Sequence, residues 1–316
     1  MALADVDQPP PRRHPLTRRA LSGLLLLAVV TAFVLVLAGQ WDEVGQQLRE
    51  QEVGVLLGAF ALCLVAVIMS FLLWRGVLSE LGSSVPVLAG SRIFFIAQLG
   101  KYLPGSVWPV VVQMRLGHDA GIPRRRTGLA FILTLGLSVI WGLIVGLLAF
   151  PALISDSSAH VGWLLLLPLV AVLLVPRVVN ALLGHMLRLL RRPGLDRPLS
   201  GRAIAVASAW TLGFWVVFGL HVWVLSVGLG ADPLVTLPVA IGGFALAFSV
   251  GPLFVVLPAG AGVREAVLVL LLTSVLDTAA ATAVALTSRG LLMATDGLLA
   301  LAGATLPGLV RRNPDP

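Results

Sequence analysis

The stretch "IAQLGKYLPGSVWPVVVQMRLG", residues 96–117, combines a charge with a chain break in an apolar setting. It holds the only lysine of the chain, Lys101, and the only tyrosine, Tyr102, and the other 21 basic residues are arginines. Pro104 and Gly105 follow directly. Proline removes a backbone donor and glycine loosens the chain, so we do not expect a continuous helix to pass through this point.

The composition identifies the class of protein. Of 316 residues, 58% are hydrophobic and 12% are charged, whereas an average soluble domain carries about 25% charged residues. Runs of about 20 apolar residues can cross the ~30 Å hydrocarbon core as helices, and the period-2 alternation of a β-barrel is absent. The sequence therefore predicts an all-α, polytopic membrane protein. Its net charge of +7 comes from short arginine tracts between apolar runs, which indicate topology and not nucleic acid binding.

Six apolar runs are predicted to be full membrane spans. They lie at about 20–39, 53–74, 127–150, 161–175, 203–228 and 281–306. The positive-inside rule places the arginine-bearing segments in the cytosol, namely residues 1–19, 75–92, 115–126, 177–202 and 311–316. We therefore expect a disordered cytosolic tail at 1–19, a single transmembrane domain at 20–310, and a second cytosolic tail at 311–316.

Two broken segments are predicted to be re-entrant hairpins. Both ends of residues 93–114 lie on the cytosolic side, and broken backbone is tolerated at membrane depth only where protein or a wet cavity surrounds it. Residues 234–276 form a second apolar stretch, interrupted by "LPAGAGVRE" at 257–265, whose two ends both lie outside. The alternative interpretation makes both broken segments full spans, or divides the second into two.

The two hairpins suggest an internal repeat. Leu103-Pro104 and Leu257-Pro258 lie 154 residues apart in the numbering. The halves, about 20–150 and 161–306, begin on opposite faces of the membrane, so the repeat is inverted. In transporters, paired Gly/Pro-broken segments of an inverted repeat indicate a substrate site near the midplane.

Inserting an ionisable side chain into the middle of a membrane costs about 2.5–3.5 kcal/mol on insertion scales. Each such residue is therefore a candidate for a structural or functional role. Lys101 is predicted either to bind an anion such as a lipid phosphate or to anchor at the cytosolic interface. Arg264 follows the glycine-rich turn "PAGAG", where backbone N–H groups and a guanidinium favour a phosphate. Glu265 either stabilises the helix dipole or acts in gating or proton coupling.

Arg289 and Asp296 lie seven residues apart on one face of the last span. They are expected either to form structural ion pairs, with each other or with neighbours, or to line a cavity and exchange partners. His221 is expected to be a hydrogen-bonded packing residue rather than a proton carrier. Gly142 and Gly146 form G-x-x-x-G, which predicts close helix packing within the chain or in a homo-oligomer.

Signatures of soluble enzymes are missing. "GKY" at 100–102 does not complete a P-loop, and neither G-x-S-x-G nor H-E-x-x-H occurs. The single cysteine, Cys63, allows neither an intramolecular disulfide nor a cysteine metal cluster. We therefore predict no cofactor, no metal and no catalytic residue.

Two motifs resemble those of the lysylphosphatidylglycerol synthase transmembrane region, the flippase-like domain family. They are "GKYLPGSVWPVVVQMRLG", followed by a basic loop, and "LPAGAGVREAVLVLLL" about 150 residues later. The resemblance covers about residues 20–310. It implies the membrane half of proteins that attach lysine to phosphatidylglycerol and move the product between leaflets. The soluble aminoacyl-transferase half is not expected, because residue 316 follows the last span closely.

These observations together predict translocation of a phosphate-bearing lipid or lipid-linked precursor across a bacterial cytoplasmic membrane. The expected partner is an anionic head group or a prenyl phosphate. The alternatives are a membrane subunit for a separately encoded glycosyltransferase or synthase, and an intramembrane lipid transferase with Glu265 or His221 as base. The candidate substrate-binding residues are Lys101, Tyr102, Pro104, Gly105, Pro258, Gly260, Gly262, Arg264, Glu265, Arg289 and Asp296. The resemblance implies seven of these, and Lys101 follows from composition.

Overall fold

The computed structural model describes residues 51–103, 107–147, 149, 172–189, 198–251, 260 and 262–305. Every regular element in these ranges is helical, which confirms the all-α prediction. The elements are α3 (Val53–Glu80), α4 (Val87–Gln98), η1 (Leu99–Tyr102), α5 (Trp108–Asp119), α6 (Arg124–Gly146), η3 (Val172–Leu174), α9 (Pro176–Leu189), α10 (Gly201–Gly228), α11 (Pro233–Val250), α12 (Val263–Leu272) and α13 (Thr278–Thr305). The expected tails, the span at 20–39 and most of the span at 161–175 lie outside the described residues.

Five described helices are long and apolar enough to cross a membrane. Three of them, α3, α10 and α13, have 28 residues each, α6 has 23 and α11 has 18, so they measure about 27–42 Å at 1.5 Å per residue. The sequence placed spans at the positions of α3, α6, α10 and α13. The prediction of a multi-pass membrane protein is therefore confirmed. Helix α11 is also long enough to cross a membrane, although it lies in the stretch for which the sequence predicted a hairpin.

The helices of the broken segments other than α11 are too short to cross the hydrocarbon core alone. Both α4 and α5 have 12 residues and α12 has 10, which correspond to about 18 Å and 15 Å. Helix α4 packs against α5, and α11 packs against α12. Each broken segment of the sequence thus folds into two adjacent helices with the break between them.

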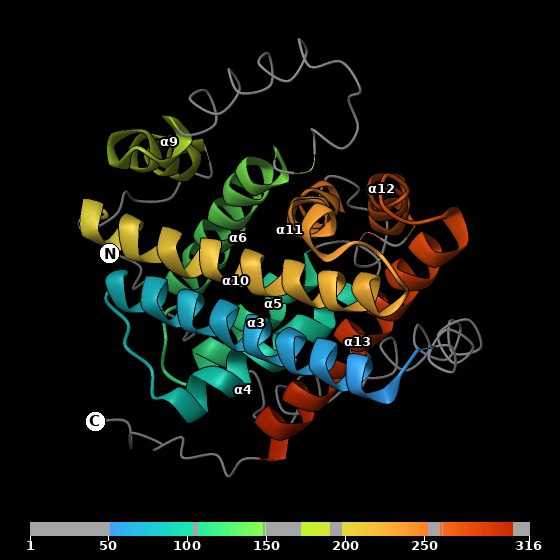
Figure 1. Ribbon diagram of the computed structural model, residues 1–316. Helices are drawn as coiled ribbons and strands as arrows, with labels where there is room; N and C mark the ends of the chain where they lie inside the picture. Colours follow the sequence, from blue (N-terminus) through green and yellow to red (C-terminus); the bar gives the residue numbers. More distant parts are fainter. Residues whose placement is uncertain are drawn as a thin grey trace, which may run out of the picture.

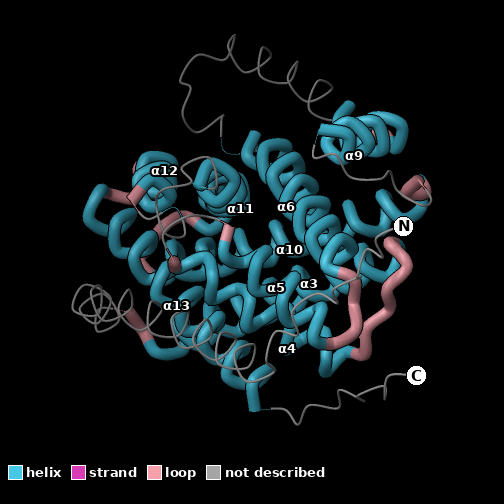
Figure 2. The backbone as a smooth tube through the Cα atoms, turned by 180° about the vertical axis from the view of Figure 1, so that it is seen from behind, coloured by secondary structure: helices cyan, strands magenta, loops and turns pink. Residues whose placement is uncertain are grey.

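The long helices α3 and α10 lie side by side and run in opposite directions through the middle of the molecule (Figure 1). Helix α13 packs against α4 and α12, and α6 packs against α5 and α11. Seen from behind, α4 and α5 lie at the lower side of the bundle and α11 and α12 at the upper side (Figure 2). The helices of both broken segments therefore pack against α13 and α6.

Aromatic side chains fill two parts of the core. Phe71 and Trp74 of α3 pack on Phe94 of α4, with ring centroids 5.8 and 5.6 Å from the Phe94 ring. Trp215 and Phe218 of α10 pack on the α11 aromatics at centroid distances of 5.3–6.3 Å. Such tilted and edge-to-face pairs add about 0.5–1.5 kcal/mol each beyond area burial. They attach one helix of each broken segment to a long helix.

Glycines allow the closest helix crossings. A Cβ at Gly146 of α6 would lie 3.0 Å from Leu246 Cβ of α11, and one at Gly242 would lie 2.6 Å from the Ala149 backbone nitrogen. Gly142 also faces α11, at Ser249. The G-x-x-x-G pattern therefore serves packing within the chain. At Gly219 of α10 a Cβ would overlap the backbone of Ile241.

The basic connection 177–202 contains a helix that the sequence reading missed. Helix α9 buries Val179, Leu183 and Leu187, spaced four residues apart, and exposes Leu182 and Leu189. Asn180 fixes it to the start of α10, because its amide donates to the Leu199 carbonyl and accepts from the Leu199 N–H. The i, i+4 spacing of these apolar residues is the sequence signal for the helix.

We predict that Gly219→Ala lowers stability by about 1–3 kcal/mol, because the added methyl must displace the α11 backbone. Gly136→Ala is the matched control, since nothing lies within 4 Å of its Cβ position. Alanine should be neutral or favourable there by its helix propensity. Thermal unfolding in detergent measures both variants. Equal effects of the two substitutions would contradict the close α10–α11 approach.

Candidate functional site

The first break begins directly after Tyr102. Helix α4 tightens into the 3₁₀ turn η1, and Leu103 then adopts an extended conformation with φ −81° and ψ 144°. Helix α5 begins at Trp108 with Pro109 in its first turn. Gly100 allows the two sides to meet, because a Cβ there would lie 2.9 Å from the Trp108 and Pro109 backbone. The predicted break is confirmed at Leu103, and Pro104 and Gly105 themselves lie outside the described residues.

The second break uses glycines in the same way. Gly260 approaches Gly251 so closely that a Cβ on it would lie 2.9 Å from Gly251 Cα. Gly260 and Gly262 have φ of +68° and +83°, values that only glycine adopts readily. The Gly262 N–H donates to Glu265 Oε2 at 2.6 Å and so caps α12. Glu265 therefore holds the helix start, one of the two expected roles, and Pro258 lies outside the described residues.

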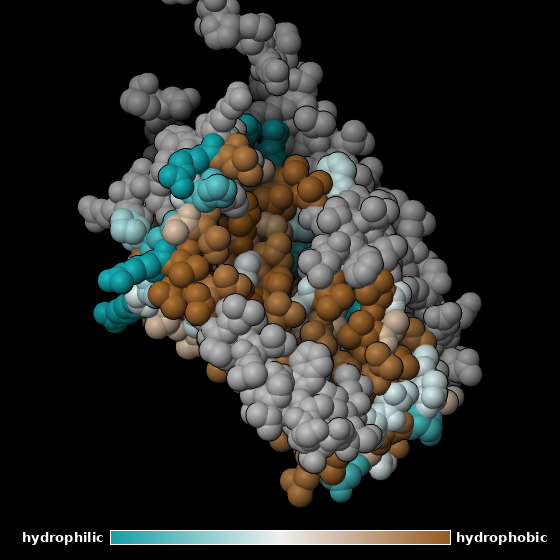
Figure 3. Space-filling model, turned by 90° about the horizontal axis from the view of Figure 1, so that it is seen from above, coloured by the Kyte–Doolittle hydropathy of each residue, from teal (hydrophilic) through white to brown (hydrophobic). Residues whose placement is uncertain are grey.

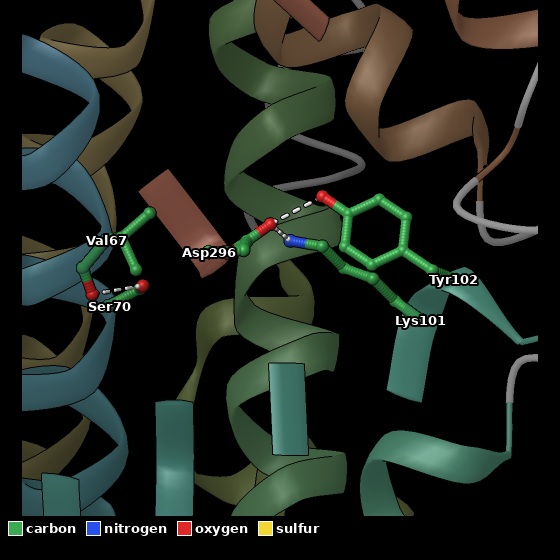
Figure 4. A network of polar contacts seen from close by, with 5 residues as sticks. All are labelled: Val67, Ser70, Lys101, Tyr102 and Asp296. Carbon is green, nitrogen blue, oxygen red and sulfur yellow. Dashed lines mark hydrogen bonds and ion pairs between the residues drawn. The ribbon is translucent and has the colours of Figure 1, made fainter. Parts of the chain in front are cut away.

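Asp296 joins the first break to the last helix (Figure 4). Its side chain is fully buried, and Oδ2 lies 2.7 Å from Lys101 Nζ. The Tyr102 hydroxyl donates to the same oxygen at 2.6 Å. Figure 4 shows both side chains of η1 pointing toward Asp296 from one side. The single lysine and the single tyrosine thus stabilise one buried carboxylate on α13.

Arg289 and Glu265 form the corresponding link at the second break. Arg289 Nη1 lies 2.7 Å from Glu265 Oε1, and the two side chains are 5% and 15% exposed. Glu265 comes from the first turn of α12, whereas Arg289 lies in the middle of α13. Helix α13 is therefore connected by one ion pair to each broken segment.

Arg264 is a buried cation without a carboxylate partner in the described part of the chain. It is 8% exposed, and its guanidinium carbon lies 5.0 Å from the ring centres of both Phe244 and Phe248. Cation–π contacts of this kind contribute about 2 kcal/mol or more when desolvated. They fix the orientation of the guanidinium, but they leave its N–H groups available for an anion.

A cavity of about 230 Å³ brings these groups together. Three cations line it, Lys101, Arg264 and Arg289, and so do the amide side chains of Gln98 and Gln113. Among the described residues that line it, none is acidic, since Glu265 and Asp296 lie behind their partners. Ser70, Thr134 and Ser138 add hydroxyl groups to the wall, and most of its other side chains are aromatic or aliphatic. Low-dielectric surroundings of this kind strengthen the attraction of an anion.

Two wall residues carry buried polar atoms with no hydrogen-bond partner in the described structure. They are Nε and Nη2 of Arg289 and Oε1 of Gln113. Nε and Nη2 form one edge of the guanidinium, the edge that binds two oxygens of a phosphate or carboxylate at once. Buried polar atoms are normally paired, so these two residues leave hydrogen-bonding capacity unused at the wall of the cavity.

The structure decides between the expected pairings of Arg289 and Asp296. Each forms an ion pair with a neighbour and not with the other, because each lies on α13 facing a different broken segment. Lys101 pairs with a fully buried carboxylate, and its own side chain is 24% exposed. His221 packs as expected and contacts Ser288 Oγ at 2.8 Å. Phe244, Phe248 and Gln113 were missed, and the lone amide within the apolar run 108–114 was the only signal for Gln113.

We predict that Lys101→Met destabilises the protein more than Asp296→Asn does. Removing the lysine leaves a charge on a fully buried side chain, whereas the Lys101 side chain is 24% exposed. Breaking a buried pair costs about 3–5 kcal/mol, and the exposure of Lys101 reduces this value for Asp296→Asn.

The double variant Lys101→Met/Asp296→Asn should recover much of the loss, as a double-mutant cycle of unfolding in detergent would measure. Additive losses would contradict a direct pair between the two side chains.

Comparison with known proteins shows that one family model covers the part of the chain that contains the site. The model of the family described as "Lysylphosphatidylglycerol synthase TM region" matches residues 21–300. Both broken segments, most of α13 and all charged residues of the cavity lie within this match. A search of curated proteins gave no match.

Proposed function

Because the chain belongs to the lysylphosphatidylglycerol synthase TM region family, we propose that it moves a phosphate-bearing lipid between the leaflets of a bacterial cytoplasmic membrane. The observation that carries the proposal is the separation of charge at the cavity. Three cations face the cavity, while the carboxylates that balance two of them lie behind. A phosphate cannot cross hydrocarbon unpaired, and fixed cations reduce that penalty.

The surface of the bundle suits a lipid whose tails stay in the membrane. Large apolar side chains of the long helices are exposed, among them Leu57, Leu212 and Leu301. Brown, hydrophobic side chains cover much of the coloured surface on the face in Figure 3, and teal, hydrophilic groups gather toward its edges. In this proposal the head group enters the cavity and the hydrocarbon tails remain between the apolar helices.

An inverted repeat is part of the proposal, and two observations support it. Helices α5 and α12 begin 155 residues apart, and α6 and α13 begin 154 residues apart. The packing partners also correspond, because α4 contacts α13 as α11 contacts α6, and α10 contacts α6 as α3 contacts α13. Exchanging α3, α4, α5 and α6 with α10, α11, α12 and α13 therefore leaves these contacts unchanged. In such repeats the site lies where the broken segments meet.

Re-entrant topology makes a prediction about loop accessibility. Single cysteines at Ser84 and Arg124, which flank α4 and α5, should label from the cytosolic side with an impermeant maleimide. Cysteines at Leu234, in the first turn of α11, and at Ser274, just after α12, should label from the outside. A Cys63→Ala background removes the native thiol, which is buried in any case. Labelling of Ser84→Cys and Arg124→Cys from opposite sides would instead show that α4 and α5 cross the membrane.

Transport itself is tested in proteoliposomes with fluorescent phospholipids in one leaflet. We expect Arg264→Gln to slow translocation at least tenfold, because a hydrogen bond from a charged donor contributes about 1.5–3 kcal/mol. Arg202→Gln is the matched control, since Arg202 is exposed and lies outside this cavity. Both proteins must show the unfolding temperature of the wild type.

The same assay separates the proposal from its alternative. If the folded wild type moves no lipid, the translocase proposal is wrong. A stable complex with a separately encoded glycosyltransferase or synthase would then identify a supporting subunit. If lipid moves equally fast in wild type and Arg264→Gln, translocation stands but this cavity does not carry it.

A further inference from the structure

We infer that α9 is a membrane-surface helix, which binds the anionic head groups of the adjacent leaflet through its arginines and places its exposed leucines in the hydrocarbon. This interaction surface lies outside the cavity of the proposed function and does not depend on lipid transport. The evidence is the distribution of side chains around α9 and the place of this helix in the bundle.

Helix α9 lies at the ends of the long helices α3 and α10. Its Val179 lines a cavity of about 360 Å³ together with Glu80, the last residue of α3, and Ser200, the N-cap of α10. With 14 residues, or about 21 Å, α9 is too short to cross the hydrocarbon core. Figure 1 shows it foreshortened beside the start of α10, which runs across the picture. A helix that crosses the ends of membrane spans lies along the membrane surface.

One exposed face of α9 is apolar. Leu182 and Leu189 lie seven residues apart on this face and are 53% and 77% exposed. The chain directly before α9 adds further exposed apolar side chains, those of Val172, Leu173 and Val175. Neighbouring exposed apolar side chains favour hydrocarbon over water. They indicate that α9 begins where the chain leaves the hydrocarbon.

The other exposed face of α9 is cationic. Arg177, His185 and Arg188 share it at positions i, i+8 and i+11. None of the ion pairs among the described residues involves either arginine, and α9 itself contains no acidic residue. At about 100° per residue, the exposed leucines lie between this cationic face and the buried face of the helix. The order around α9 is therefore protein, hydrocarbon and head groups, as an interfacial amphipathic helix requires.

An anionic leaflet fits both exposed faces at once. Guanidinium groups bind phosphate oxygens through paired, charge-assisted hydrogen bonds, and the positive-inside rule predicts the cytosolic leaflet for this arginine-rich segment. Residues 176–202 hold six arginines and one acid, Asp196. A second copy of the chain is a poorer occupant, because a two-fold interface on this surface would bring arginines against arginines.

Quenching by brominated lipids tests the inference in proteoliposomes of the full chain. Bimane is attached to Leu182→Cys in a Cys63→Ala background, and the quencher is brominated phosphatidylserine or brominated phosphatidylcholine. We expect both lipids to quench, and phosphatidylserine to associate at least fivefold more tightly, since each arginine near an anionic surface favours contact about fivefold. Bimane at Leu234→Cys is the control, because Leu234 is 84% exposed on α11, a helix without arginine. It should show no such preference.

Paired substitutions test the two arginines. Arg177→Gln/Arg188→Gln should lower the preference for phosphatidylserine below twofold and leave quenching by phosphatidylcholine unchanged. Arg177→Lys/Arg188→Lys should keep most of the preference, because lysine supplies the same charge to the surface. Both positions are exposed, so both variants should unfold at the temperature of the wild type.

The outcomes decide between lipid and other occupants of α9. If neither lipid quenches bimane at Leu182→Cys, the inference is wrong, and a disulfide dimer of Leu182→Cys would then identify a second copy of the chain. Equal association of both lipids with the wild type would overturn the assignment of anionic head groups. A preference that survives Arg177→Gln/Arg188→Gln, or is lost equally in the lysine pair, would also overturn it. None of these results bears on lipid translocation, so the proposed function stands or falls separately.

Discussion

The structure depends on neutralising one carboxylate in the middle of an apolar bundle. Asp296 lies inside α13 with its side chain fully buried, where an unpaired charge would cost several kcal/mol. Lys101 and Tyr102 reach it only because α4 ends and the chain tightens into η1 directly beside α13. The break in the first segment and the charge on the last long helix are therefore one feature, since neither is favourable without the other.

The second broken segment satisfies the same constraint with other residues. Glycine turns bring Glu265 to the start of α12, where it caps the helix and accepts from Arg289 of α13. In both places the acid lies away from the cavity and the base lies toward it. Pairing removes most of the cost of burying these charges, while the arrangement keeps donors at the cavity wall. A symmetric placement of acids and bases would have left a wall without a preference for anions.

Aromatic packing gives the site its remaining cation. Arg264 follows a glycine turn and would be costly to bury alone, but Phe244 and Phe248 cover its guanidinium from α11. The same Phe244 and Phe248 pack on Trp215 of α10. The position of the guanidinium is thus tied to the helix pair α10–α11, and any movement of α12 against α11 would change what this cation faces. The packing of the bundle therefore sets the position of this cation at the cavity.

The sequence by itself determined the class of the protein, four of the long helices and both breaks. Apolar length, the positive-inside pattern and Pro or Gly in apolar runs are local properties, so they can be predicted from neighbouring residues.

The partners of the charged residues could not be predicted in this way. Arg289 and Asp296 share a helix face by spacing, yet tertiary packing turns each toward a different broken segment. Lys101 and Asp296 are 195 residues apart in sequence, and Gln113 is one amide in an apolar helix until α5 is placed against the cavity. Which charges meet, and which cation stays unpaired, is decided only by the packing of helices far apart in the chain, because the pairing of buried charges depends on distances of a few ångströms.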